Sequence, residues 1–269
     1  MRNLILSAVL AGLSLFGATA SAEEIQAGKQ YVQLSSPVPV AQPGKIEVVE
    51  LFWYGCPHCY QLEPTIQPWA EKLPEDVNFV RIPALFGGLW NVHGQMFLTL
   101  EAMGVEPKVH DAVFAAIHRE GKKLATPEEM AEFLAGQGVD KEAFLKTFNS
   151  FAVKGQMEKA KKLAMAYQIT GVPVLVVNGK YRFDLGTAGG PNGALQVADH
   201  LIAKERATQQ APAQYRRRPC SGAGPPRARP ASGPRDTIRR PAKSLSAKPC
   251  ACSASTSRSA SAPAATITT

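Results

Sequence analysis

The order of apolar and polar positions in residues 24–207 changes period several times, and each change marks a predicted element. Strand-like apolar runs occupy 31–34, 46–53 and 77–82, and a helical pattern covers 57–72 between the last two. A strand, a helix and a second strand of these lengths predict a right-handed βαβ unit with parallel strands. The folded part therefore begins as an α/β protein.

A long helical stretch interrupts this pattern. Apolar positions at helical spacing predict helices over 92–103, 109–119, 127–135, 141–148 and 151–167. Strands return at 174–177 and 180–183 around Asn178-Gly179, a dipeptide typical of a two-residue hairpin turn. A last helix is expected over 192–205. We therefore expect an α/β domain formed by 23–87 and 151–207, with an α-helical domain inserted at 88–150.

Both ends of the chain differ from this domain in composition. Residues 1–22 combine Arg2, an apolar run over 4–16 and a small-residue cleavage pattern at Ala20-Ser21-Ala22, which together predict a secretory signal peptide. The apolar run is too short to cross a bilayer comfortably, so we expect export rather than anchoring. Residues 208–269 are rich in Arg, Pro, Ala, Ser and Gly, and we expect them to be a disordered tail.

The net charge of +8 suggests nucleic-acid binding, but its distribution does not support that function. The tail holds nine Arg, two Lys and one Asp, a net charge of +10, which leaves −2 for residues 1–207. The folded part is mildly acidic, and no nucleic-acid partner is expected for it. Two interpretations of the basic tail stay open: an arm that binds anionic lipid or nucleic acid, and a frame-shifted or read-through extension of a domain that ends near Ala207.

Cys56-Pro57-His58-Cys59 follows directly on a predicted strand and begins a predicted helix. Cys56 is thereby expected at a helix N-terminus, where unpaired N–H groups and the helix dipole favour a thiolate over a thiol. A positive charge or a donor on His58 acts in the same direction. Cys59, about one turn further on, can attack a mixed disulfide formed by Cys56. The motif predicts a thiol–disulfide exchange centre.

Two other uses of the motif stay open. A structural disulfide rarely spans only two residues, and a zinc site needs a second pair of ligands. The other cysteines are Cys220, Cys250 and Cys252, all in the tail, and the histidines outside the motif show no spacing that suggests a site shared with Cys56. We therefore expect redox chemistry and no metal.

Glu50 is a carboxylate inside an apolar strand, six residues before Cys56. Strands of a parallel sheet are usually buried on both faces, so an ionised Glu50 is costly unless it is paired. Arg81, on the next predicted strand, is its natural partner.

With these motifs the sequence resembles the DsbA family of exported thiol oxidases, which implies a thioredoxin-like fold with an inserted α-helical domain. The resemblance rests on the Cys-Pro-His-Cys motif followed by Tyr60, on Gly171-Val172-Pro173, and on Asn178-Gly179-Lys180-Tyr181. Gly28-Lys29-Gln30-Tyr31 and Asn149-Ser150-Phe151 fit as well, and the resemblance covers roughly residues 24–206.

The resemblance implies a periplasmic enzyme that passes the disulfide of its motif to newly exported, unfolded polypeptides, without an external cofactor. It also implies a cis peptide bond between Val172 and Pro173 beside the dithiol, where the backbone of Val172 can pair with an extended substrate. An apolar surface around Trp53, Tyr54 and this loop is expected to bind substrates.

The resemblance further implies that Glu50 lies beneath the dithiol and influences cysteine ionisation and proton transfer. An edge-exposed or merely ion-paired Glu50, and a passive His58, stay open as alternatives. A DsbB-like, quinone-linked membrane oxidase is implied as the partner that restores the Cys56–Cys59 disulfide, and a monomer is expected. The competing functions are a reductase, an isomerase, and a non-enzymatic CxxC metal carrier or peptide-binding chaperone.

Overall fold

The computed structural model describes residues 24–210 of the chain. The predicted signal peptide at 1–22, the tail beyond residue 210, and with it Cys220, Cys250 and Cys252, lie outside the described residues. No helix within 24–210 is long and apolar enough to span a membrane.

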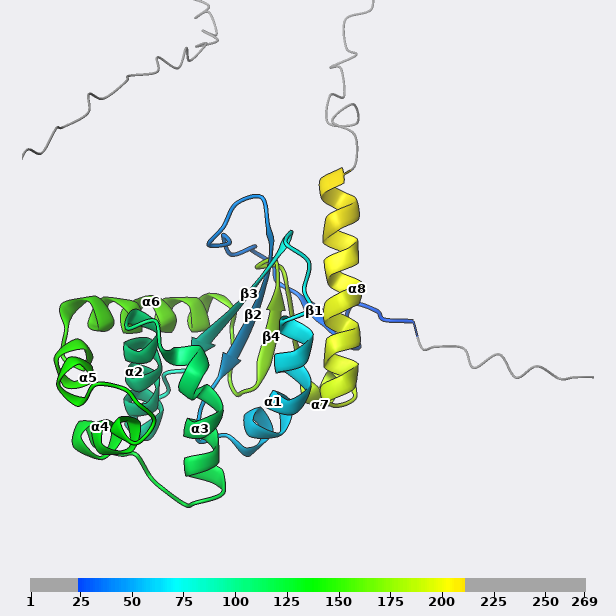
Figure 1. Cartoon of the computed structure of the whole chain (residues 1–269). Helices are drawn as coiled ribbons and strands as arrows, with labels where there is room; N and C mark the ends of the chain where they lie inside the picture. The colour runs from blue at the N-terminus through cyan, green and yellow to red at the C-terminus, as the bar shows by residue number, and fades with distance from the viewer. Residues whose placement is uncertain (1–23, 211–269) are drawn as a thin grey trace, which may run out of the picture. The chain divides into compact units, whose positions relative to one another are not determined.

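A mixed sheet of five strands lies at the centre of the described residues, in the order β1-β5-β4-β2-β3 (Figure 1). The strands are β1 (Val32–Gln33), β2 (Ile46–Phe52), β3 (Val77–Pro83), β4 (Val174–Val177) and β5 (Tyr181–Asp184). β2 and β3 are parallel, as the sequence predicts, and their register places Glu50 opposite Arg81. The other strand pairs are antiparallel.

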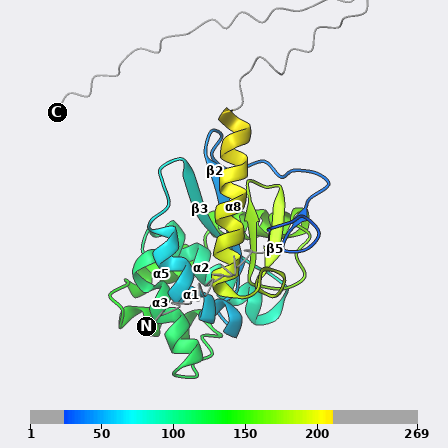
Figure 2. The same cartoon turned by 90° about the vertical axis from the view of Figure 1, so that its right-hand side faces the viewer.

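Helices cover both faces of this sheet. They are α1 (Pro57–Ala70), α2 (Gly88–Ala102), α3 (Glu106–His118), α4 (Pro127–Ala135), α5 (Lys141–Phe148), α6 (Phe151–Ala166), α7 (Leu185–Ala188) and α8 (Pro191–Gln210). Successive side chains of a strand point to opposite faces. Val48 of β2 therefore packs with Ile66 of α1 and with α8, whereas Val49 packs with Ala160 of α6. Figure 2 shows α8 crossing in front of the sheet.

The helical insert has a core of its own, beside the end of β2. Phe97 of α2, Phe114 of α3 and Phe144 of α5 meet there with Val153 of α6. Cys56 and Cys59 are buried in the same cluster, so the insert closes over the predicted redox motif. α6 contributes to both cores, since its first turns face the insert and its last turns face the sheet.

Several predicted elements coincide with the structure, and the differences have local causes. The predicted helices 127–135 and 141–148 and the strand 174–177 match α4, α5 and β4. α2 begins four residues before the predicted 92, because its N-cap is Gly87, which makes no side-chain cap that a sequence pattern would reveal. α8 continues to Gln210, past the expected domain end at 207, and the short α7 was not predicted.

The hairpin predicted at Asn178-Gly179 is confirmed. Both residues have positive φ, 51° and 63°, which is the backbone that a type I′ turn requires. A Cβ on Gly179 would lie 1.9 Å from the carbonyl oxygen of Val38, so only glycine fits there without movement.

Candidate active site

Cys56 and Cys59 lie where the sequence places them, at the junction of β2 and α1. Cys56 is the N-cap of α1, and its Sγ accepts a hydrogen bond from the backbone N–H of Cys59 at 3.4 Å. Pro57 occupies the first helical position, where its missing N–H costs nothing. Both cysteines are free thiols, with Cys56 7 % exposed and Cys59 fully buried.

The pKa values of the two thiols are shifted in opposite directions. The hydrogen bond from the Cys59 thiol is the largest cause that lowers the pKa of Cys56, from 9.0 to about 6, against the opposing effect of burial. Backbone N–H groups of Cys59 and His58, and the charge of the exposed His58, lower it further. Burial and the neighbouring Cys56 instead raise the pKa of Cys59 far above its ordinary value. One sulfur is therefore a stable thiolate at neutral pH, and the other holds its proton.

The loop before β4 brings a distant part of the chain to the reactive sulfur. The Val172–Pro173 peptide bond is cis, which confirms the bond that the family resemblance implied. The Sγ of Cys56 lies 3.5 Å from the carbonyl oxygen of Val172. A groove passes beside the pair and is lined by His58, Gln61, Val172, Pro173, Leu185 and Pro191. The unpredicted helix α7 thus forms one wall of the groove.

The apolar surface predicted beside the motif is only partly correct. Trp53 is half-buried and stacks on Trp90 of α2 at a centroid distance of 4.1 Å, and Phe86 lies against Trp90 and is exposed. Tyr54 is 1 % exposed, so the prediction that it contacts substrates is wrong. The reason is its hydroxyl, which finds a buried partner on His110 at 3.1 Å.

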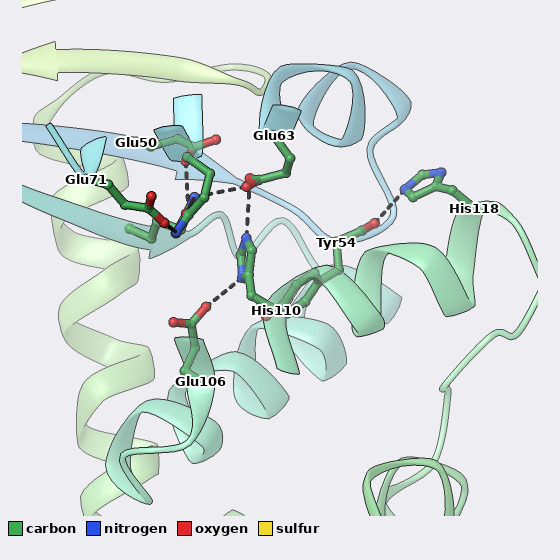
Figure 3. Close-up of polar contacts among 9 residues, drawn as sticks. Glu50, Tyr54, Glu63, Glu71, Glu106, His110 and His118 are labelled. Atoms are coloured by element: carbon green, nitrogen blue, oxygen red, sulfur yellow. Dashed lines mark hydrogen bonds and ion pairs between the residues drawn. The ribbon is translucent and has the colours of Figure 1, made fainter. Parts of the chain in front are cut away.

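Glu50 lies in a buried cluster of charged side chains that includes Glu63, His110 and Glu106 (Figure 3). Arg81 donates from Nε to Glu50 at 3.1 Å and from a terminal guanidinium nitrogen to Glu63 of α1 at 2.9 Å. The predicted Glu50–Arg81 pair is therefore confirmed, and the edge-exposed alternative for Glu50 is wrong because its side chain is fully buried. His110 of α3 continues the cluster, with ion-pair distances of 3.2 Å to Glu63 and 2.5 Å to Glu106.

The surroundings of Glu50 make it a group that changes protonation near neutral pH. Burial raises its pKa from 4.5 to about 7, the charge of Glu63 adds to this effect, and Arg81 and His110 oppose it. The charge of Glu50 in turn contributes to the raised pKa of Cys59. The charge of this carboxylate thus connects it to the buried thiol.

Sequence reasoning missed Glu63, Glu106 and His110, although each left a signal. Glu63 shares the buried face of α1 with Cys59, Leu62 and Ile66. His110 and Glu106 lie on the buried face of α3, among apolar residues at helical spacing. A charged residue on an apolar helix face needs a buried partner, but the pattern alone does not identify that partner.

No three His, Cys, Asp or Glu side chains between residues 24 and 210 are arranged to hold a metal ion. The charged cluster around Glu50 is instead organised as ion pairs between carboxylates and the two cations Arg81 and His110.

Comparison with known proteins agrees with this geometry. A family model described as a DSBA-like thioredoxin domain matches residues 91–192. The thiol:disulfide interchange protein DsbA of Pseudomonas aeruginosa is 77% identical over 207 residues, which cover 77% of this chain and 98% of that protein. The protein of the same name from Azotobacter vinelandii is 73% identical over 214 residues, covering 78% of this chain and 100% of that protein. The crystal structure of Pseudomonas aeruginosa DsbA superposes with a TM-score of 0.69 at 77% identity, covering 70% of this chain and 98% of the other.

Proposed function

This chain belongs to the DsbA family and is a thiol:disulfide oxidoreductase with a thioredoxin-like fold, and from that premise we propose that it oxidises newly exported polypeptides through its Cys56–Cys59 disulfide. The observation that carries the proposal is the contrast between the two thiols. A thiolate stabilised at Cys56 favours the reduced enzyme, and a disulfide whose reduced form is stabilised is a strong oxidant. DsbA itself is the standard example of this linkage.

The proposed reaction has two steps. A substrate thiolate attacks Sγ of Cys56, the Cys56–Cys59 bond breaks, and its electron pair goes to the sulfur of Cys59. A second substrate thiolate then attacks the substrate sulfur of the mixed disulfide, and Cys56 leaves as a thiolate. Two electrons pass from the substrate dithiol to the enzyme, so the substrate becomes a disulfide and the enzyme a dithiol.

Each remaining site residue has a proposed part in this reaction. The sulfur of Cys59 leaves in the first step and must gain a proton, because its buried thiolate is unstable. Glu50, with a pKa of about 7, is the proposed partner for that proton, and Arg81 holds Glu50 in place. His58 assists the Cys56 thiolate, and Pro57 starts the helix that supports it.

Substrate binding is proposed for the groove and the apolar surface beside Cys56. An extended polypeptide can pair with the backbone of Val172, next to Pro173, and so bring its own cysteine to the reactive sulfur. Trp53 and Trp90 offer a flat apolar surface that suits many sequences. Broad substrate choice agrees better with such shallow contacts than with a deep specific pocket.

We propose the following setting for this chemistry. The chain acts in the periplasm as a monomer, after removal of the signal peptide predicted at 1–22, with the Cys56–Cys59 disulfide as its redox group and no other cofactor. A DsbB-like, quinone-linked membrane oxidase restores the disulfide, and nucleic acid is not a partner. The domain limits of 23–87 with 151–207, and of 88–150 for the insert, are part of the same proposal. The tail was predicted to begin at 208, but residues 208–210 belong to α8 and the rest of it lies outside the described residues.

Refolding of a reduced, denatured disulfide protein tests the proposal. We expect the oxidised chain to restore activity to that protein in stoichiometric amounts, and Cys56→Ser to abolish this effect. Cys59→Ser is the matched control, since it keeps Cys56 but cannot form the Cys56–Cys59 disulfide. When its Cys56 is first converted to a mixed disulfide with glutathione, attack by a substrate thiolate on Cys56 should release glutathione and leave a protein mixed disulfide on a non-reducing gel. An equilibrium with glutathione that leaves the Cys56–Cys59 pair predominantly oxidised would favour a reductase instead. Activity or metal binding that survives Cys56→Ser would favour a chaperone or metal carrier.

A further inference from the structure

His110 connects the helical insert to the redox helix. Its Nε2 lies 3.2 Å from Oε1 of Glu63, which is on α1 together with Cys59, and its Nδ1 lies 2.5 Å from Oε1 of Glu106. Figure 3 shows the imidazole between these two carboxylates. Its side chain is 4 % exposed, so no solvent screens the two contacts.

Helix α3, which carries His110, also holds the segment that leads to Cys56. The Tyr54 hydroxyl lies 3.1 Å from Nδ1 of His110, and Nε2 of His118 lies 2.7 Å from the Tyr54 carbonyl oxygen. Helix α3 therefore contacts both the side chain and the main chain of the residue two positions before Cys56. The insert therefore covers the redox centre and also holds the segment before Cys56 in place.

The buried cluster carries one more negative than positive charge, so it can bind one proton. Three buried carboxylates, Glu50, Glu63 and Glu106, face two cations, Arg81 and a protonated His110. The cluster is then one positive charge short of neutral, and uptake of one proton completes it. Oε1 of Glu50, Glu63 and Glu106 are all buried without a hydrogen-bond partner among the described residues. Those of Glu63 and Glu106 lie against the His110 ring, so Oε1 of Glu50 is the place for that proton.

We propose that His110 is a positioning residue of the redox centre: through its charge, held between Glu63 and Glu106, it sets how readily Glu50 takes up and releases a proton. The inference rests on the proposed role of Glu50 as the proton partner of Cys59. Through His110 the helical insert acts on the chemistry of a carboxylate that belongs to the sheet.

The protonation of His110 follows from all the groups that face it. Burial lowers its pKa, but hydrogen bonds to Glu106 of its own helix and to Glu63 of α1 outweigh this effect and raise the pKa from 6.5 to about 9. Arg81 of β3 opposes protonation. Tyr54 stays neutral, because burial raises its pKa well above 10.0. His110 is therefore a cation at neutral pH, and its charge lowers the pKa of Glu50.

Charge variants of the full chain test the inference. They should shift the titration midpoint of Glu50 in opposite directions, which a purely structural role would not produce. In the reduced protein, with carbon-13 in the glutamate carboxyl groups, the Glu50 resonance is assigned by comparison with Glu50→Gln. Removal of the cation in His110→Gln should raise the Glu50 titration midpoint by about one pH unit, a tenfold change in proton affinity. Removal of an acid in Glu106→Gln should lower the midpoint.

The double variant Glu106→Gln/His110→Gln is the matched control, because it removes one charge of each sign. Its Glu50 midpoint should return close to that of the parent protein. It also avoids leaving a buried charge unpaired, so it keeps the test usable if His110→Gln does not fold. A midpoint that shifts in the same direction in all folded variants, or that does not shift in either single variant, would overturn the inference.

These titrations are independent of the proposed oxidase activity. A parent protein that fails to oxidise a reduced polypeptide would contradict the proposed function and leave the titrations unchanged. A parent protein that oxidises substrate but shows no charge-dependent shift at Glu50 would contradict the role of His110 alone.

Discussion

The Sγ of Cys56 lies 3.5 Å from the carbonyl oxygen of Val172, although 116 positions of the sequence separate the two residues. A thiol at Cys56 can donate to this oxygen, whereas a thiolate cannot, so the contact does not cause the lowered pKa. That effect comes from donors at Cys59 and in the first turn of α1. The reactive atom therefore lies between a helix that stabilises its anion and a loop that is able to hold a substrate.

The first prediction concerns the donor that contributes most to the Cys56 thiolate. Cys59→Ala removes the side-chain hydrogen bond to Cys56 and should raise the pKa of Cys56 above about 6. Cys59→Ser keeps a hydroxyl donor and should raise it less. Thiolate absorbance recorded against pH measures both midpoints. Equal midpoints in the two variants would show that the Cys59 side chain does not donate to Cys56.

His58→Ala should have the smaller effect on the same pKa. The charge of this exposed histidine is among the lesser causes acting on Cys56, and its backbone N–H remains in the variant. We expect a rise in the Cys56 midpoint below that of Cys59→Ala, together with a less oxidising disulfide in a glutathione equilibrium. A passive His58 would leave both quantities unchanged.

The lowered pKa of Cys56 also predicts a pH window for stability. In the folded reduced protein this thiol ionises near pH 6, against an ordinary value of 9.0. Because the folded pKa is the lower one, its contribution to stability is complete only above pH 9, and is lost as the pH falls to about 6. The disulfide form has no such group. The stability of the reduced form relative to the oxidised form, from urea unfolding, should therefore increase between pH 6 and 9, and a constant difference would contradict the lowered pKa.

Glu50→Gln should slow the step in which Cys59 attacks a mixed disulfide on Cys56. Two effects oppose each other, because loss of the Glu50 charge lowers the pKa of Cys59 while loss of the carboxylate removes a proton acceptor. A nearby charge changes a pKa by about 1–3 units, and general acid–base catalysis contributes about 10²–10⁴-fold. We expect the loss of the proton acceptor to outweigh the lowered pKa of Cys59 near pH 7, where the Glu50 of the parent protein titrates.

Stopped-flow release of glutathione from the Cys56 mixed disulfide measures this step. Glu47→Gln is the matched control, since Glu47 is also buried on β2 but belongs to the other face and accepts a hydrogen bond from the Ala41 N–H. A rate that is the same in Glu50→Gln as in the parent protein would exclude Glu50 as the proton partner.

Gly179→Ala should destabilise the fold without touching the redox centre. An alanine with positive φ costs about 1–2 kcal/mol, and its Cβ would overlap the carbonyl oxygen of Val38, which adds about 1–3 kcal/mol. Gly138→Ala is the control, because Gly138 also has a positive φ but has open space around its Cβ position. Urea unfolding should show the larger loss for Gly179→Ala, and equal losses would indicate that the hairpin relaxes away from Val38.

The elements of the fold were accessible from sequence because their signals are local. Thr126 and Pro127 mark the beginning of α4, and Asn178-Gly179 marks the turn between β4 and β5. α2 lacked such a signal at its start, since Gly87 caps it without a side chain. The groove wall at α7 was missed for a related reason: four residues are too few for a helical period to show.

The sequence alone determined that a dithiol stands at the end of a buried strand and the start of a helix, a position that favours a thiolate at Cys56. Only the tertiary structure decided that Tyr54 turns inward, and that Glu50, Glu63, Glu106 and His110 share one buried set of charges with Arg81. The physical reason is that periodicity records which residues are buried, whereas ion-pair partners are chosen by the packing of distant segments. The amino-acid sequence shows that a buried Glu63 or His110 needs a partner of opposite charge, and only the fold identifies that partner.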